Sequence, residues 1–218
     1  MEDPASTASL AEATEATPTL ADPRPPEVVE LAHALIHTRQ TILPKRLGDP
    51  GPDAAQTQVI LGAAASAPDH HELLPWRFIV VPPAARGRLA DAFASALVQR
   101  DASAIPRQIE QAREKAFRAP LLLLAVARLR DHDAEIEPHE RIVSAGCALQ
   151  NMLLMAHALG FGAALTSGKA LASSALRELF DLQADEQALC FVSVGTVIKA
   201  KPRRLRPAPA HYVSVLAP

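Results

Sequence analysis

The chain has 218 residues, 49% of them hydrophobic, which is enough for one domain with a substantial core. A formal net charge of -2 and an aromatic content of 4% argue against the basic surface and stacking platforms on which nucleic-acid binding depends. No apolar run reaches the roughly 18 to 20 residues of a membrane span, and acidic residues open the chain where a signal sequence has basic ones. We therefore expect a cytoplasmic protein with no nucleic-acid partner and no membrane partner.

The composition changes at residue 27. Residues 1–26 are rich in Ala, Thr, Pro and acidic side chains, so burial cannot offset their ordering entropy, and a disordered tail is predicted. Residues 27–218 are predicted to form the folded domain. Apolar residues recur at helical spacing from Glu27 and predict a first helix that ends in HTRQ. A second helix is predicted between Asp53, a good N-cap, and Pro68.

The rest of the chain alternates between helical and strand patterns. The strand expected at 119–128 is apolar on both faces, which predicts a central position in a sheet. The helix expected at 140–160 is apolar nearly all round, which predicts burial on every side and, in a chain of this size, a dimer core. The other expected elements are strands at 77–81, 160–168, 188–198 and 211–216, helices at 84–99 and 173–182, and a charged helical excursion at 101–119.

The stretch APDHHELLPWRFIVV, residues 67–81, places two histidines in a loop bounded by prolines. A metal site, an acid/base cluster and a polar loop shaped around a cofactor are the three interpretations to separate. The metal interpretation fails because Pro75 stands where the H-E-x-x-H motif needs its second histidine. For His70 and His71 the residues alone leave two roles open, either closing backbone polar groups of the loop or contacting a ligand.

The remaining short motifs do not indicate a dinucleotide-binding fold, a hydrolase or a zinc site. Gly160-Phe161-Gly162 lacks the third glycine of the dinucleotide motif, and it leaves a helix to enter a strand, which reverses the Rossmann order. No G-x-S-x-G elbow is present. Cys147 and Cys190 lie in apolar surroundings without another Cys or a His at ligand spacing, so buried free thiols are predicted.

The order of several longer motifs resembles the nitroreductase family from about Glu27 to the C-terminus. The motifs are HTRQ where the family has Arg-Arg-Ser, then APDHHELLPWRF, AFRAPLLLLAVA, SAGCALQNMLLMAHALGFGAALTSG and VSVGT. The resemblance implies an α+β fold, with a three-layer α/β/α sandwich and a mixed, mainly antiparallel central sheet. It also implies an intertwined homodimer that binds one FMN noncovalently at each of two sites along the dimer interface.

The resemblance also implies the residues of the site. No catalytic side chain is expected, because the flavin carries the chemistry and the protein positions its ligands. The cofactor-binding residues implied are Thr38, Arg39, Gln40, Ser66, His70, Thr166, Ser167 and Gly168. The residues implied on the nicotinamide and substrate side are His157, Leu159, Gly160 and Phe161.

The chain departs from the family pattern at the phosphate end of this site. Thr38 replaces a second arginine beside Arg39, Gln40 replaces a serine, and Leu165-Thr166 replaces a Trp-Arg pair. Two phosphate-side cations are therefore missing, although a phosphate dianion needs fixed positive charge. The cations that could replace them are Lys45, Arg46, Lys169 and Arg204.

The activity implied by the resemblance is an FMN-dependent oxidoreductase. NAD(P)H, the co-substrate, would give a hydride to the flavin, leave, and be replaced by a nitroaromatic, a quinone or a similar small-molecule acceptor, in a ping-pong sequence. Two alternatives stay open. One is a flavin-binding or storage protein with little turnover, and the other is a different flavin reaction on the same scaffold, such as dehydrogenation or reductive dehalogenation.

Overall fold

A computed structural model describes residues 25–130, 135–202 and 204–217. The predicted tail, residues 1–26, lies almost wholly outside the described residues. In the part that is described, no helix is long and apolar enough to cross a membrane.

The chain forms one five-stranded sheet. Its strand order is β1-β5-β3-β2, and β4 also pairs with β5. Every pair of named strands is antiparallel, while an isolated bridge between Thr41 and Ala163 is parallel, so the sheet is mixed and mainly antiparallel as predicted. The strands are β1 (Leu47–Gly48), β2 (Trp76–Val80), β3 (Leu121–Arg128), β4 (Gly162–Thr166) and β5 (Glu186–Val197).

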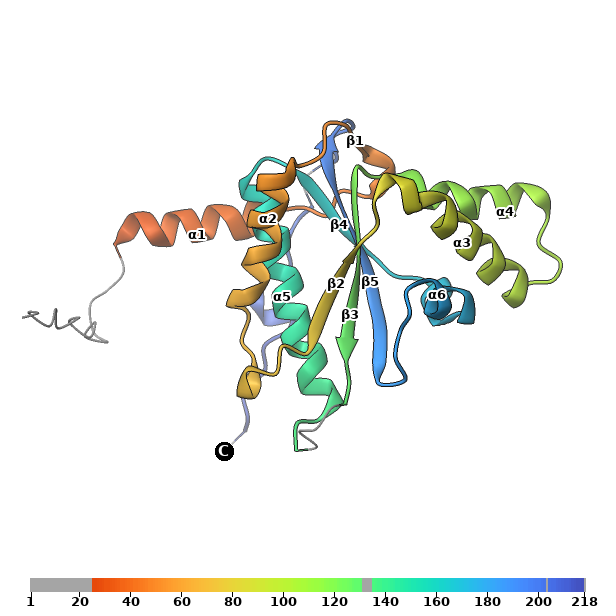
Figure 1. Ribbon diagram of the computed structural model, residues 1–218. Coiled ribbons are helices and arrows are strands. Elements are labelled where there is room, and N and C mark those ends of the chain that lie inside the picture. The colour runs from red at the N-terminus through yellow and green to blue at the C-terminus, as the bar shows by residue number, and fades with distance from the viewer. Residues whose placement is uncertain (1–24, 131–134, 203, 218) are drawn as a thin grey trace, which may run out of the picture.

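Helices cover both faces of the sheet (Figure 1), with α2 and α5 on one face and α3, α4 and α6 on the other. The predicted three-layer arrangement is therefore confirmed. The α-helices are α1 (Pro26–Thr38), α2 (Ala54–Gly62), α3 (Arg86–Arg100), α4 (Pro106–Arg113), α5 (Pro138–Ala158) and α6 (Ser174–Leu179). Short 3₁₀ turns lie at Pro44–Arg46, Ala63–Ser66, His70–Glu72, Pro83–Ala85, Glu114–Phe117, Lys169–Ala172 and Pro209–His211.

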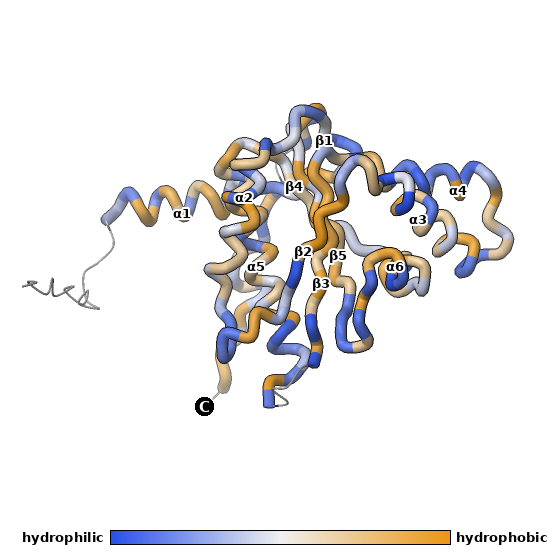
Figure 2. The backbone as a smooth tube through the Cα atoms, viewed as in Figure 1, coloured by the Kyte–Doolittle hydropathy of each residue, from blue (hydrophilic) through white to orange (hydrophobic). Residues whose placement is uncertain are grey.

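The core is divided by the sheet, and β3 explains why its sequence is apolar throughout. Leu123 and Ala125 pack toward α5, whereas Leu122 and Leu124 pack toward α3. Successive side chains of a strand point to opposite faces, so a strand with a helix layer on each side needs no polar face. Figure 2 shows this as hydrophobic colouring concentrated in the sheet. The predicted central position of β3, which pairs with β2 and β5, is confirmed.

The predicted N-cap of α2 is also confirmed. Asp53 Oδ1 accepts a hydrogen bond from the Gln56 amide at 2.8 Å, and Gln56 Oε1 accepts one from the Asp53 amide at 3.0 Å. This reciprocal capping box satisfies two backbone donors that the first turn of a helix leaves free. The capping box sets the residue at which α2 begins, and α2 then packs against α5.

Two predictions, one about segment 211–216 and one about α5, are wrong for a single chain. The segment 211–216 was expected to be a strand, but it begins in a 3₁₀ turn and remains irregular, with Val215 90% and Leu216 93% exposed. The segment alternates apolar and polar residues, but it does not form a strand because it pairs with no described strand of its own chain. The helix α5 is not buried on every side either, because Val143 is 64% exposed.

The two cysteines carry free thiols, as predicted. Cys190 is buried in the sheet, and burial raises the pKa of its thiol to about 11. Cys147 is only half-buried, which corrects the expectation that both are fully enclosed. A thiol whose pKa is raised by burial is a poor nucleophile at neutral pH, so Cys190 acts as a small apolar side chain.

Candidate functional site

The C-terminal ends of α1 and α5 meet through a side-chain contact. Thr38 Oγ1 lies 2.7 Å from His157 Nε2, and it donates its hydrogen to the Ala34 carbonyl at 2.6 Å. Because the hydroxyl has one hydrogen, His157 Nε2 must be the donor in the contact with Thr38. Gly160 then reverses the chain with φ of 87°, a conformation that glycine adopts without strain, and directs it into β4.

A cavity of about 300 Å³ opens beside this contact, and we call it the Arg39 cavity. Six of the twelve site residues implied by the sequence resemblance line this cavity. Leu159 does not line the cavity, and it packs against the core on the α5 side of the sheet. The lining residues are Thr38, Arg39, Gln40, Ile42, Leu153, His157, Gly160, Phe161, Gly162, Ala163, Val197, Ala200 and Lys201.

Two buried polar atoms at this cavity have no hydrogen-bond partner among the described residues. They are Nε of Arg39 and Oε1 of Gln40. Burial, and then the nearby positive charge of Arg206, lower the pKa of the Arg39 guanidinium. A buried donor without an acceptor is costly, and so is a guanidinium facing another cation. Arg39 therefore offers an anion in this cavity a free donor and a positive charge, while Gln40 Oε1 offers an acceptor to a hydroxyl or amide group.

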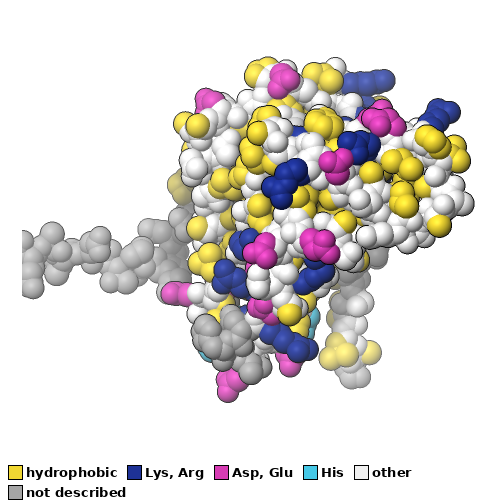
Figure 3. Space-filling view, turned by 45° about the vertical axis from the view of Figure 1, so that its right-hand side comes forward, with side chains coloured by type: hydrophobic (Ala, Val, Ile, Leu, Met, Phe, Trp, Pro, Cys, Tyr) yellow, Lys and Arg dark blue, Asp and Glu magenta, His cyan; other side chains and the backbone are white. Residues whose placement is uncertain are grey.

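A second cavity, of about 690 Å³, lies on the opposite face of β4, and we call it the α4 cavity. Its floor is apolar and includes Phe93 and Phe191, whose rings meet edge to face at 5.4 Å. Figure 3 turns the α3 and α4 side toward the viewer and shows basic, acidic and hydrophobic side chains interspersed on it. The polar and charged lining residues are Arg100, Gln108, Gln111, Glu114, Lys115, Arg118, Thr166, Ser167, Lys169 and Ser193.

The alternation of side chains along β4 separates the two groups of predicted cofactor residues. Ala163 faces α5 and lines the Arg39 cavity, whereas Thr166, three residues on, lines the α4 cavity. Ser167 and Gly168 follow Thr166 in the α4 cavity. β4 therefore runs between the two cavities. The Arg39 cavity lies at the start of the strand, and the α4 cavity, with residues 166–168, lies at its end.

Ser66 ends the 3₁₀ turn that packs against α5 and does not line the Arg39 cavity, and His70 lies at the other end of α5 from that cavity. His70 Nδ1 is 3.2 Å from Glu140 Oε2 in the first turn of α5, while His157 is in its last turn. At 1.5 Å per residue the two ends are about 25 Å apart. Figure 1 shows the loop that carries His70 and the end of α1 at opposite ends of α5. One chain therefore does not bring the predicted cofactor residues together.

The loop around His70 has an unusual backbone. His71, Glu72 and Leu74 have φ values of 56°, 54° and 48°, a region that non-glycine residues adopt rarely. Asp69 Oδ2 accepts a hydrogen bond from the Leu74 amide at 2.7 Å and so closes the turn. His70 hydrogen-bonds the Glu140 carboxylate and thereby lowers its pKa.

The structure also shows which cations lie near the Arg39 cavity. Arg46 donates to the Ala200 carbonyl at 2.5 Å, and Lys169 lines the other cavity. None of the four predicted replacements, Lys45, Arg46, Lys169 and Arg204, lines the Arg39 cavity. Lys201 lines it instead, and Arg206 Nη2 donates to the Arg39 carbonyl at 2.6 Å. Neither residue was predicted from the sequence, although both belong to a run of basic residues at 199–206.

The chain matches a known protein family. The model of the nitroreductase family matches residues 36–196, well over half of the chain. The chain belongs to the nitroreductase family. Membership makes it a nitroreductase-type oxidoreductase, as the sequence resemblance predicted.

Two bacterial relatives share about a third of their residues with this nitroreductase. A protein of Haemophilus influenzae is 33% identical over 175 residues, which cover 80% of this chain and 93% of the relative. YdjA of Escherichia coli K12 is 34% identical over 173 residues, which cover 78% and 91%. Both are named "Putative NAD(P)H nitroreductase".

Crystal structures of other proteins share the fold of this nitroreductase. A nitroreductase-like family protein from Bacillus cereus gives a TM-score of 0.73 at 16% identity, covering 92% of this chain and 99% of that chain. An iodotyrosine deiodinase bound to FMN and 3-iodo-L-tyrosine gives a TM-score of 0.62 at 20% identity, covering 84% and 97%. At these identities the likeness establishes the fold alone, and the predicted nitroreductase-like α+β fold is confirmed.

Proposed function

We propose that the chain is an FMN-dependent NAD(P)H oxidoreductase that reduces nitroaromatic, quinone or similar acceptors in a ping-pong sequence. The observation that carries the proposal is the Arg39 cavity, where the buried Nε of the half-buried Arg39 has no hydrogen-bond acceptor among the described residues. A phosphate dianion supplies both the charge and the acceptor that are missing there. The residues present therefore fit the phosphate of FMN.

The protein's part in such a reaction is to bind and to position. Bound flavin supplies hydride acceptance and donation. Arg39 binds the phosphate, and Gln40 offers its unpartnered Oε1 as an acceptor for a hydroxyl of the ribityl chain. His157, held by Thr38, keeps its hydrogen on Nε2 and borders the cavity with Phe161. No side chain is required as an acid or base.

We also propose that the functional unit is a homodimer in which Ser66 and His70 reach the cofactor of the partner subunit. The separation of about 25 Å between the two ends of α5 supports this arrangement, because one chain cannot close the site. The helix α1 supports it as well, since it projects from the body and contains no buried residue (Figure 1). Its exposed apolar side chains are Val28, Val29, Leu31 and Ile36.

The dimer leads to a direct expectation. A monomer would expose a large hydrophobic surface. This surface comprises the apolar side chains of α1, the side chain of Val143 in α5 and the apolar side chains of segment 213–216. Sedimentation equilibrium at micromolar concentration is expected to give a dimer. A stable monomer under these conditions would remove the basis for a site shared between two subunits.

One experiment tests the proposed activity. The purified protein, loaded with FMN and desalted, is expected to keep the visible absorption band of flavin and to oxidise NAD(P)H when a quinone is added. Retained flavin without NAD(P)H oxidation would favour the storage alternative. Retained flavin with redox-neutral turnover of another substrate would favour a different flavin reaction. Loss of all flavin on desalting, and no rise in melting temperature with FMN, would contradict the proposal.

A further inference from the structure

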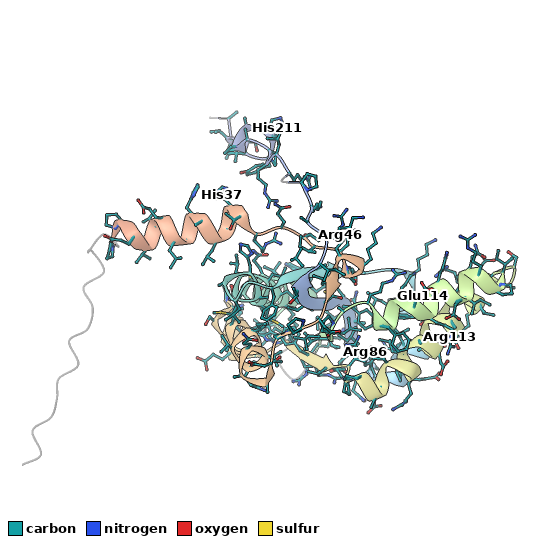
Figure 4. All side chains as sticks on the ribbon, turned by 90° about the horizontal axis from the view of Figure 1, so that it is seen from above. His37, Arg46, Arg86, Arg113, Glu114 and His211 are labelled. Atoms are coloured by element: carbon teal, nitrogen blue, oxygen red, sulfur yellow. The ribbon has the colours of Figure 1, made fainter. Side chains whose placement is uncertain are left out.

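The contact between Thr38 and His157 joins two helix ends that lie far apart in the chain. Thr38 is the last residue of α1, and His157 is in the last turn of α5, 119 residues later. Figure 4 labels His37, the neighbour of Thr38, where α1 meets the body of the molecule. Both Thr38 and His157 line the Arg39 cavity. The pair therefore stands where the family pattern has a second arginine and this chain has a threonine.

The hydrogen bonds of this pair fix which ring nitrogen of His157 remains for a ligand. The Thr38 hydroxyl donates to the Ala34 carbonyl at 2.6 Å, so it can only accept from Nε2 of His157, 2.7 Å away. The described residues offer no hydrogen-bond partner to the other ring nitrogen, Nδ1. With its hydrogen on Nε2, a neutral imidazole presents Nδ1 as an acceptor, and Nδ1 becomes a donor only when the ring takes up a second proton. An anion at Nδ1 therefore binds the imidazolium form.

The charges around the cavity favour this second proton once an anion is bound. The charged side chains that line the cavity with His157 are Arg39, from the end of α1, and Lys201, from the segment after β5. Arg206, which does not line the cavity, adds a further cation beside Arg39. None of the described Asp and Glu residues lines it. Cations disfavour the protonation of a neighbouring imidazole, whereas a phosphate dianion favours it, so phosphate binding here draws a proton onto His157.

We propose that His157 is a cofactor-binding residue: with Nε2 held by Thr38, its Nδ1 takes up one proton from solvent and donates it to an oxygen of the FMN phosphate. Thr38 is the positioning residue, because its hydroxyl fixes the ring through Nε2. This inference rests on the proposed function, because it places the phosphate of FMN in the Arg39 cavity. It moves His157 from the nicotinamide side, where the resemblance placed it, to the phosphate. An imidazolium on α5 then supplies the positive charge that a threonine at residue 38 lacks.

Proton uptake separates this role of His157 from a purely structural one. FMN is titrated calorimetrically into flavin-free protein in two buffers with different ionisation enthalpies, which counts the protons taken up. At a pH of about 7.5 a phosphate with a second pKa of about 6 is already a dianion, so it contributes little to that count. The parent is expected to take up roughly half a proton or more per FMN and none with riboflavin, which lacks the phosphate. His157→Gln is expected to abolish the uptake, to weaken FMN binding roughly tenfold and to leave riboflavin affinity within about twofold.

His37→Gln is the matched control, because it removes an imidazole from the same end of α1 at a residue that does not line the cavity. Its FMN affinity and its proton uptake are expected to equal those of the parent. Thr38→Val is expected to weaken FMN binding about threefold in the parent and to have no further effect in His157→Gln, because Thr38 acts through His157.

Thermal melts of the flavin-free variants show whether each is folded, and His157→Phe, which keeps a ring at this position, replaces His157→Gln should that variant unfold. Unchanged FMN affinity or unchanged proton uptake in the His157 variant, or equal losses for FMN and riboflavin, would overturn the assignment while leaving the proposed function intact. If the parent binds neither flavin, the proposed function fails and the assignment fails with it.

Discussion

Replacing Arg39 with alanine is expected to weaken FMN binding by roughly tenfold to 150-fold, the loss that corresponds to a charge-assisted hydrogen bond worth about 1.5 to 3 kcal/mol. The flavin-free protein is expected to melt at the same temperature as the parent or higher. Its stability does not suffer because the substitution removes a buried Nε without a described partner and a positive charge that faces Arg206. Fluorescence titration of FMN and thermal melts without flavin give the two values.

A matched control for this variant is Lys45→Ala, which removes a positive charge from an exposed residue that does not line the cavity. Its FMN affinity is expected to stay within about twofold of the parent, because an exposed lysine outside the cavity contributes little. Unchanged FMN affinity in Arg39→Ala would show that the phosphate does not lie in the Arg39 cavity. A large loss of stability in the flavin-free variant would show that Arg39 is a structural residue.

The second large effect is expected at Arg86, where alanine should lower the free energy of unfolding by about 3 kcal/mol or more. Arg86 is 4% exposed, and its guanidinium donates to three backbone carbonyls. Truncation leaves all three without this donor and opens a cavity beside α3 (Figure 4). The acceptors are Val81 at 2.9 Å, Ala116 at 2.7 Å and Pro120 at 3.1 Å.

These three acceptors explain why one arginine matters so much. They lie after β2, in the turn after α4 and before β3, so Arg86 fixes the helical excursion to the sheet. Denaturant unfolding of Arg86→Ala and of the exposed neighbour Arg88→Ala measures the difference. Arg88→Ala is expected to change the free energy of unfolding by less than about 0.5 kcal/mol. An equally small effect at Arg86 would mean that its burial costs as much as its hydrogen bonds contribute.

Local patterns in the sequence predicted the elements and their faces well. The apolar run at 119–128 predicted a central strand because a strand between two helix layers cannot carry a polar face, and β3 has this position. Asp53 predicted the beginning of α2 because a cap depends on residues three apart in the chain. Family membership was predictable too, since the motifs between HTRQ and VSVGT keep their order.

Contacts between distant segments were not predictable in the same way. The motifs do not show that His70 and Arg39 lie at opposite ends of α5, because sequence spacing carries no information on how α2 runs along that helix. The alternation in 211–216 predicts a strand but not a neighbouring strand to pair with. Arg206 was missed because its link to Arg39 spans 167 residues of chain, and a basic run is usually only a solvated surface.

The shared site is tested most directly by a mixed dimer of Arg39→Ala and His70→Glu chains, co-expressed with different affinity tags and titrated with FMN. If Arg39 of one subunit and His70 of its partner share a site, one site of the mixed dimer is doubly altered and the other is intact. Half of the sites are therefore expected to bind FMN with parental affinity, while each variant alone binds weakly. A mixed dimer without any parental site would contradict the shared site, because it would place Arg39 and His70 of one chain in the same site.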